Sequence, residues 1–150
     1  MGRRLGIVLG AGLLLGAVGN AVSPRGLSWS NPLGNGLRSR AAEEGLVPVN
    51  LDAARRILRL PGLVVLDSRP REEFRIGRLP GARSLPWAEA EEGRALPPPA
   101  GPVLVYCSNE FCESSLRLGQ WLRSKGIRDV ALLVEGYDGW WNDRGPIDQD

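Results

Sequence analysis

The chain has 150 residues, 19 basic and 17 acidic side chains, a formal net charge of +2 and no histidine. This length suits one ordinary domain, and so small a charge, carried by scattered basic residues, does not predict nucleic-acid binding. The lack of histidine excludes a Ser-His-Asp triad, a Cys-His pair and imidazole metal ligands, and two cysteines alone cannot form a structural zinc site. We therefore expect neither a metal nor another cofactor.

The amino terminus has the pattern of a targeting segment. Arg3 and Arg4 precede residues 5–22, which are uncharged and rich in Leu, Val, Gly and Ala. A basic start and an apolar stretch predict export, or an apolar helix that remains as a membrane anchor, since roughly 17–25 residues can span a bilayer. Residues 1–22 are thus expected to be a signal peptide or a transmembrane anchor, with a buried core helix as the weaker alternative. Arg3 and Arg4 are expected to remain cytoplasmic, so we expect the following domain on the extracytoplasmic, periplasmic side.

Residues 23–45 are expected to form a linker, because Ser, Asn, Gly, Pro and Arg follow one another there without a sustained hydrophobic period. The globular domain is then expected over residues 46–150. Its pattern predicts, in chain order, an edge strand at 47–49, a helix capped by Asn50, a strand at 63–66, a helical turn at 71–74, a strand at 82–85, a helix at 87–92, a strand at 103–106, a helix at 114–125, a strand at 130–134 and a short helix carrying Trp140 and Trp141. Strands alternating with helices predict an α/β domain with a mostly parallel sheet and helices on both faces.

The stretch around Cys107 carries the chemistry. Four apolar residues precede Cys107, and a helix is expected from Ser114, so Cys107 should lie at the carboxyl end of a strand, where open α/β sheets bind ligands. Loop amides and a helix dipole stabilise an anion there, and a thiolate is an anion. Cys107 is therefore the candidate nucleophile, with an inert core cysteine as the alternative. The candidate active-site loop continues through Ser108, Asn109, Glu110, Phe111, Cys112, Glu113 and Ser114.

From about residue 47 to residue 147 the chain resembles a single rhodanese domain. The resemblance rests on the order and spacing of several short pieces: Val64-Val65-Leu66-Asp67-Ser68-Arg69, Glu73-Phe74, Gly77-Arg78-Leu79-Pro80-Gly81-Ala82, Val105-Tyr106-Cys107, Gly126-Ile127-Arg128-Asp129-Val130, Leu133-Val134-Glu135-Gly136, Trp140 and Gly145-Pro146-Ile147. It implies a rhodanese-like fold with a five-stranded parallel sheet, here preceded by an N-terminal apolar helix. It also implies a sulfurtransferase that carries sulfane sulfur as a persulfide on Cys107, with a small sulfur donor and a thiol or other nucleophilic acceptor as partners.

Three positions depart from the family pattern. Arg78 stands where the family usually has histidine, while Glu110 and Cys112 take the glycine and arginine places of a Cys-x-x-Gly-x-Arg loop. A second loop cysteine resembles a subset of exported or membrane-linked rhodanese-like proteins. Glu110 and Glu113 also place negative charge at the loop, which should repel dianions such as thiosulfate unless arginines compensate.

Cys112 has three interpretations. It forms a disulfide with Cys107 in an oxidising compartment, it accepts sulfur from Cys107 or resolves its persulfide, or it is a small loop residue without chemistry. Among these we favour a reversible disulfide that switches the site off. Asp67 and Arg69 are candidate supporting residues, although an acid and a base at a strand end more often cap loops and pair with neighbours.

Two other functional classes are weighed against the sulfurtransferase. A phosphatase or arsenate reductase would need Cys-x5-Arg to bind an oxyanion, and Glu113 occupies the arginine place. The second class is a non-catalytic or redox-sensing binding module, tethered at the membrane through residues 5–22, since a fold persists when activity is lost. The sequence does not identify a protein partner.

Overall fold

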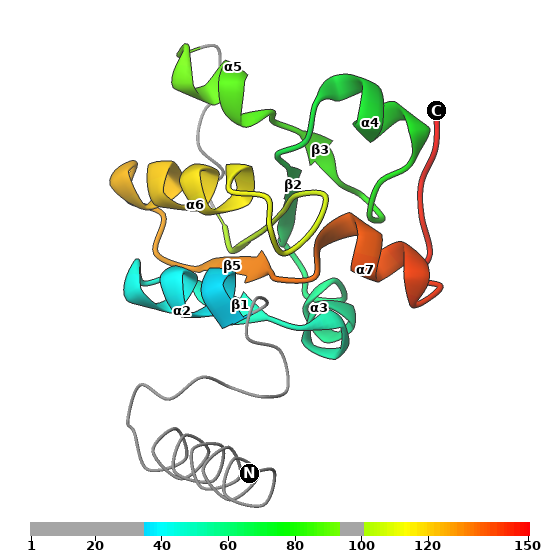
Figure 1. Ribbon diagram of the computed structural model, residues 1–150, viewed down its shortest axis with the longest axis horizontal. Helices are drawn as coiled ribbons and strands as arrows, with labels where there is room; N and C mark the ends of the chain where they lie inside the picture. Colours follow the sequence, from blue (N-terminus) through cyan, green and yellow to red (C-terminus); the bar gives the residue numbers. More distant parts are fainter. Residues whose placement is uncertain (1–34, 94–100) are drawn as a thin grey trace, which may run out of the picture. The chain divides into compact units, whose positions relative to one another are not determined.

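The computed structural model describes residues 35–93 and 101–150 (Figure 1). The expected apolar segment at 5–22, and with it the signal or anchor, lies outside the described residues. Within the two described ranges, no helix is both long enough and apolar enough to cross a bilayer.

Five short strands form one sheet in the order β1-β5-β4-β2-β3, and every pair is parallel. The strands are β1 (Val47–Val49), β2 (Val64–Asp67), β3 (Arg83–Ser84), β4 (Val103–Tyr106) and β5 (Val130–Leu133). The predicted five-stranded α/β sheet is confirmed, with small shifts at the strand ends. After β2 the chain moves outward to β3, whereas after β4 it moves the opposite way to β5. The carboxyl ends of β2 and β4 therefore flank a topological switch point, where such sheets bind ligands.

Helices cover both faces of the sheet (Figure 1). One face packs against α2 (Asn35–Glu43), α5 (Trp87–Glu91) and α6 (Ser114–Ser124), and the other against α3 (Leu51–Ile57) and α7 (Gly136–Asn142). Side chains of β4 alternate between them: Val103 and Val105 join the first core, Leu104 and Tyr106 the second. All four are buried, which explains why this strand is continuously apolar. The remaining helix, α4 (Arg71–Ile76), buries none of its residues.

The expected linker is wrong over its second half. Residues Asn35–Glu43 form helix α2, and its Leu37 and Ala41 lie in the core, 5% and 0% exposed. These two positions are four apart, so they share one helix face. The compact domain accordingly begins near Gly36 and not near residue 46.

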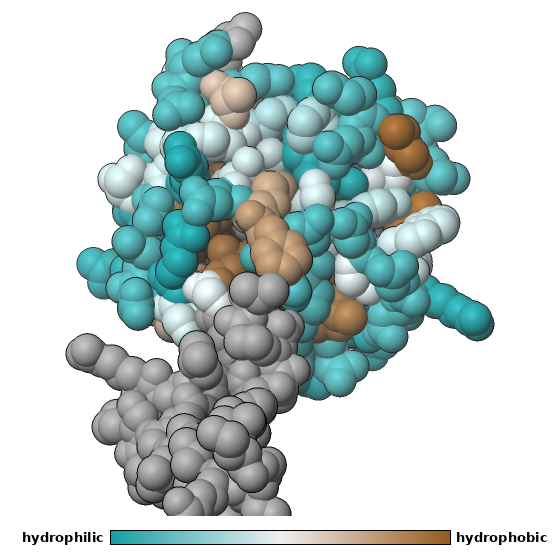
Figure 2. All heavy atoms as spheres, viewed as in Figure 1, coloured by the Kyte–Doolittle hydropathy of each residue, from teal (hydrophilic) through white to brown (hydrophobic). Residues whose placement is uncertain are grey.

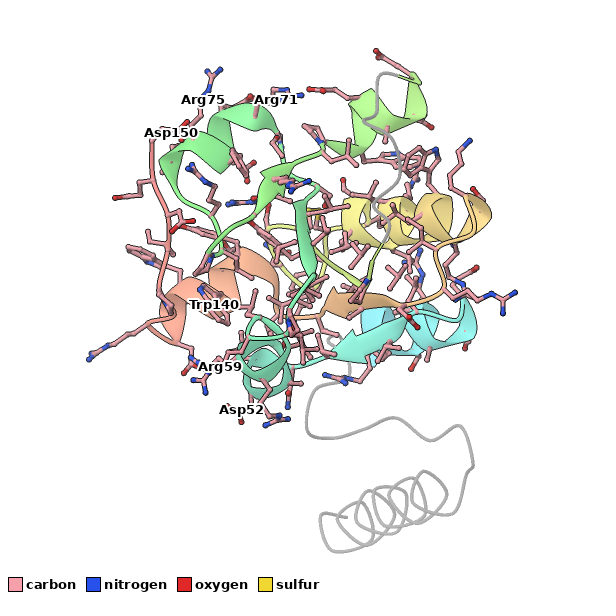
Figure 3. All side chains as sticks on the ribbon, turned by 180° about the vertical axis from the view of Figure 1, so that it is seen from behind. Asp52, Arg59, Arg71, Arg75, Trp140 and Asp150 are labelled. Atoms are coloured by element: carbon pink, nitrogen blue, oxygen red, sulfur yellow. A yellow bond between two sulfur atoms is a disulfide. The ribbon has the colours of Figure 1, made fainter. Side chains whose placement is uncertain are left out.

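Local signals elsewhere act as predicted. Asn50 caps α3, because its Oδ1 accepts a hydrogen bond of 3.0 Å from the Ala53 amide. On the second face, the Trp140 indole packs into the core between α7 and α3 (Figure 3) and donates to the Pro146 carbonyl at 2.8 Å. This bond ties the carboxyl-terminal segment to α7.

Candidate active site

Cys107 directly follows the last residue of β4 and is only 2% exposed. Its sulfur is bonded to that of Cys112, and the two Cα atoms are 6.1 Å apart. The predicted disulfide is therefore present, while its reversibility stays a prediction. Cys112 is half-buried, so it is the more accessible of the two sulfur-bearing residues.

The expected loop residues from Ser108 to Glu113 lie together between β4 and α6, and Ser114 is the first residue of α6. Asn109 organises the loop: its side-chain Oδ1 accepts from the Phe111 amide at 3.1 Å, and its carbonyl accepts from the Cys112 amide at 3.1 Å. This turn directs the chain back, so that Cys112 reaches Cys107. Phe111 lies at the outside of the turn and is 64% exposed. In Figure 2, apolar surface lies over this loop.

Helix α7 fixes the base of the loop. The amides of Tyr137 and Asp138 each donate 2.8 Å hydrogen bonds, to the carbonyls of Cys107 and Ser108 respectively. Gly136 starts the helix at φ +61°, and a Cβ there would lie 2.6 Å from both carbonyl oxygens. Only glycine allows this approach. The position of the Cys107 backbone is thus set from a neighbouring element and not by the disulfide alone.

Asp67 and Arg69 form a buried ion pair at the end of β2. The Arg69 guanidinium donates to both carboxylate oxygens of Asp67 at 2.6–3.1 Å, and to the Gly77 carbonyl at 2.6 Å. Asp67 also accepts from the Tyr106 hydroxyl, which in turn accepts from the Leu79 amide at 3.2 Å. These contacts hold the chain segments around the switch point.

The electrostatics of this cluster keep Arg69 and Tyr106 in fixed charge states. Burial would lower the pKa of Arg69, but the hydrogen bond and the charge of Asp67 outweigh that effect, so the pKa is raised and Arg69 stays cationic. Burial, followed by the nearby Asp67 carboxylate, raises the pKa of Tyr106 far above its ordinary value. Neither group is poised to exchange a proton near neutral pH, so the cluster acts as a support.

Glu73 connects this support to the loop, a role that our sequence analysis did not assign. Its carboxylate lies 3.9 Å from Arg69 Nη1 and accepts a 3.2 Å hydrogen bond from the Ser108 hydroxyl. On the other side of the loop, Asn109 donates to Asp138 of α7 at 3.0 Å. Glu73 and Ser108 are 35 residues apart in the chain, so no local pattern joins them.

The negative charge of Glu113 is compensated by two arginines. Arg40 of α2 donates to its carboxylate at 2.8 Å, and Arg117 lies one helical turn further on at 3.5 Å. The hydrogen bond from Arg40 is the main reason that the pKa of Glu113 is lowered. The negative charge of Glu113 is therefore offset by arginines from two helices, and one of these helices, α2, lies where a linker was expected. Glu110 is half-buried in the same loop.

A shallow pocket of about 390 Å³ opens beside the amino terminus of α6. It is lined by Ser68, Pro70, Arg71, Glu72, Pro86, Trp87, Ala88, Glu89 and Ser114. Arg71 extends from α4 toward α5 (Figure 3) and pairs with Glu89 at 2.6 Å. The charges of this pair offset each other, so the pocket presents mainly apolar walls. Among residues 35–93 and 101–150, no cluster of three or more His, Cys, Asp or Glu side chains could hold a metal ion.

The chain is similar to known proteins in both sequence and structure. The family profile described as rhodanese-like domain matches residues 50–143. A curated HTH-type transcriptional regulator of Mycobacterium tuberculosis is 29% identical over 87 residues, which is 58% of this chain but only 38% of that protein. The chain thus spans well under half of the curated relative that it matches.

Solved structures share the fold at low sequence identity. A protein from Bacillus halodurans superposes with a TM-score of 0.60 at 18% identity, over 77% of this chain and 85% of its own. A Rhodopseudomonas palustris protein of unknown function, described as a possible tyrosine phosphatase, gives 0.57 at 23% identity, over 75% and 94%. At these identities the likeness establishes the fold alone.

Proposed function

Because the chain belongs to the rhodanese-like domain family over residues 50–143, we propose that it is a sulfurtransferase carrying sulfane sulfur as a persulfide on Cys107. The observation that carries the proposal is the position of Cys107. It lies at the carboxyl end of β4, beside the switch point, in a loop that leads into the amino terminus of the 11-residue helix α6. Loop amides and the dipole of α6 would favour the thiolate and the anionic persulfide alike.

The reaction starts from the reduced site. A thiol reductant opens the Cys107–Cys112 disulfide with two electrons, which leaves a thiolate on Cys107. This thiolate attacks the outer sulfur of the donor, a new S–S bond forms, and the donor's leaving group departs with its electron pair, as sulfite if the donor is thiosulfate. An acceptor thiolate then attacks the outer sulfur, and Cys107 leaves as the thiolate.

The surrounding residues position this chemistry. The hydrogen bonds described for Asp67 and Arg69 run to one another and to Tyr106 and Gly77, so we assign them a positioning role. Glu73 carries that support to Ser108 in the loop. Arg40 and Arg117 reduce the repulsion that Glu113 would exert on an anionic donor.

The second candidate function is a redox-sensing or partner-binding module. The disulfide favours it, because the sulfur of Cys107 is already bonded to Cys112. A phosphatase is not supported, because Glu113 occupies the position where an oxyanion-binding arginine would be required.

A sulfur-transfer assay on the reduced protein distinguishes the candidates. Reduced wild type should transfer sulfur from at least one of thiosulfate, inorganic polysulfide and cysteine persulfide to a small thiol. Cys107→Ser should lose this activity while its circular dichroism spectrum is retained. Undiminished transfer by Cys107→Ser would refute the assignment. A reduced wild type that is inactive with all donors, yet alkylates at Cys107, would favour the binding module.

We also propose that residues 5–22 attach the protein to the membrane or direct its export, with the domain on the extracytoplasmic side. The support is the charge pattern of Arg3 and Arg4 before an apolar stretch. Carboxyl-terminal fusions to alkaline phosphatase, active only outside the cytoplasm, and to a fluorescent protein that matures only inside it test the orientation. Activity of the cytoplasmic reporter alone would reject it.

A further inference from the structure

Cys112 is placed to remove the sulfur that Cys107 carries. We infer that Cys112 is the resolving cysteine of a sulfane-sulfur reductase, which releases the bound sulfur as sulfide and leaves the Cys107–Cys112 disulfide. This inference rests on the proposed function, because it takes the Cys107 persulfide as its starting point. The disulfide then has two origins: it forms when Cys112 attacks the Cys107 persulfide, and it also forms when the two thiols are oxidised directly.

The geometry of the loop carries the inference. In a Cys107 persulfide the inner sulfur is Sγ of Cys107, and that is the atom to which Cys112 is bonded. A Cys112 thiolate that attacks the inner sulfur therefore forms the bond already present. The Cys112 sulfur can approach the Cys107 sulfur without a rearrangement of the loop backbone, since the two Cα atoms are only 6.1 Å apart.

The contacts that hold Cys112 there do not depend on the disulfide. Neither turn bond around Asn109 involves a sulfur atom, nor does the 3.0 Å bond from the Asn109 side chain to Asp138 of α7, so we expect these bonds to persist when the disulfide is reduced. The bond from the Tyr137 amide to the Cys107 carbonyl likewise involves backbone atoms alone. An internal thiol held in this way reacts far more readily than the same thiol free in solution. Cys112 also stands two residues before α6, whose dipole favours its thiolate.

The two cysteines differ in exposure, and this difference predicts which of them an external thiol attacks. Cys107 is 2% exposed and Cys112 is half-buried, so a bulky thiol reaches Cys112 more easily. The exposed ring of Phe111 stands next to Cys112 and offers an apolar contact to the reductant. We assign the external reductant to the class of dithiols, which attack Cys112 and release Cys107 as the thiolate.

The cycle balances in atoms and electrons. The Cys107 thiolate takes one sulfur atom from the donor, for example from thiosulfate with loss of sulfite. The Cys112 thiolate attacks Sγ of Cys107, the S–S bond to the outer sulfur breaks, and that sulfur leaves with the electron pair as hydrosulfide. The two cysteines are thereby oxidised to the disulfide and the sulfane sulfur is reduced to sulfide. A dithiol reduces the disulfide and becomes a disulfide itself.

The test compares the reduced, full chain with its Cys112→Ser variant under anaerobic conditions, after removal of reductant. Each protein is mixed with thiosulfate, and separately with cysteine persulfide. Sulfide is quantified, and sulfite too in the thiosulfate mixture, and intact mass is recorded. Wild type should release one sulfide per chain and lose about 2 Da relative to the dithiol, whereas Cys112→Ser should release none above background and gain about 32 Da for one retained sulfur. Circular dichroism checks that the variant is folded, and Cys112→Ala repeats the comparison with a second side chain.

Each other outcome overturns the inference in a recognisable way. If wild type keeps its added sulfur as long as Cys112→Ser does, Cys112 does not resolve the persulfide, and the proposed sulfurtransferase still stands. If wild type becomes the disulfide without releasing sulfide, the disulfide is an oxidation product only. If neither protein takes up sulfur from either donor, the proposed function fails and this inference fails with it.

Discussion

Replacing Arg69 by leucine tests whether the buried ion pair supports the site or takes part in the chemistry. Asp67 is 0% exposed and the Arg69 side chain is 3% exposed, so the substitution leaves a carboxylate in the interior without its counter-ion. Breaking a buried pair from one side costs about 3–5 kcal/mol. The Gly77 carbonyl also loses its 2.6 Å donor, whereas the Tyr106 hydroxyl still donates to Asp67. We therefore expect Arg69→Leu to lower the free energy of unfolding by about 3–5 kcal/mol, which is a large part of the 5–15 kcal/mol that is typical of a whole domain.

The free energy of unfolding is measured by urea titration at pH 7, with tryptophan fluorescence as the signal. The double variant Asp67→Asn/Arg69→Leu should lose less unfolding free energy than the two single variants lose in sum, by at least about 1 kcal/mol. The reason is that the double variant buries no unpaired charge. Strict additivity, or a loss below about 1 kcal/mol for Arg69→Leu, would refute the reasoning. Arg69→Lys serves as the functional control: if it keeps the stability of wild type but loses sulfur transfer, Arg69 acts in the chemistry.

Three further outcomes follow from the site. The pKa of Tyr106 is higher in the folded than in the unfolded protein. The stability that the Tyr106 hydroxyl contributes is therefore complete below its pKa in the unfolded chain, about 10, and is lost as the pH rises further. The unfolding free energy of wild type should thus exceed that of Tyr106→Phe by about 1–3 kcal/mol at pH 8, and the gap should narrow above pH ~10, by up to ~1.4 kcal/mol per unit; a constant gap would contradict this. Gly136→Ala should lower the free energy of unfolding by about 2–5 kcal/mol, because the new Cβ adds both backbone strain and overlap with the Cys107 and Ser108 carbonyls. Gly126→Ala, at φ +91° with nothing within 4 Å of the new Cβ, should lose only the strain of about 1–2 kcal/mol. Equal losses in the two variants would disprove the close contact at Gly136. Arg40→Ala should raise the pKa of Glu113 in a carboxyl NMR titration, and an unchanged value would remove Arg40 from the site.

The sequence predicted those parts of the molecule that depend on local pattern. The apolar run before Cys107 and the helical spacing after Ser114 were sufficient to place the loop at the carboxyl end of a central strand. The disulfide was foreseeable because both cysteines lie in that one short loop. Such features are determined by neighbours in the chain, which a single sequence displays.

The remainder depends on contacts between distant segments. Helix α2 was missed because its described buried residues, Leu37 and Ala41, are too few to give a visible hydrophobic period. Its Arg40 meets Glu113 across 73 positions, so the compensation of the loop charge had no sequence signature. Glu73 was part of the family resemblance, but its bond to Ser108 became visible only in three dimensions.

Strand β1 lies just before residue 50, where the family match begins, and it covers the outer edge of β5. A chain trimmed to residues 50–143 would expose the backbone donors and acceptors of Val130–Leu133, four consecutive aliphatic residues. Open edges of this kind pair with other chains and aggregate. In the intact protein, Pro48 makes β1 a poor template for further strands, because it offers no N–H. Insolubility of the trimmed chain would therefore be a consequence of the missing edge strand, and would carry no information about the chemistry at Cys107.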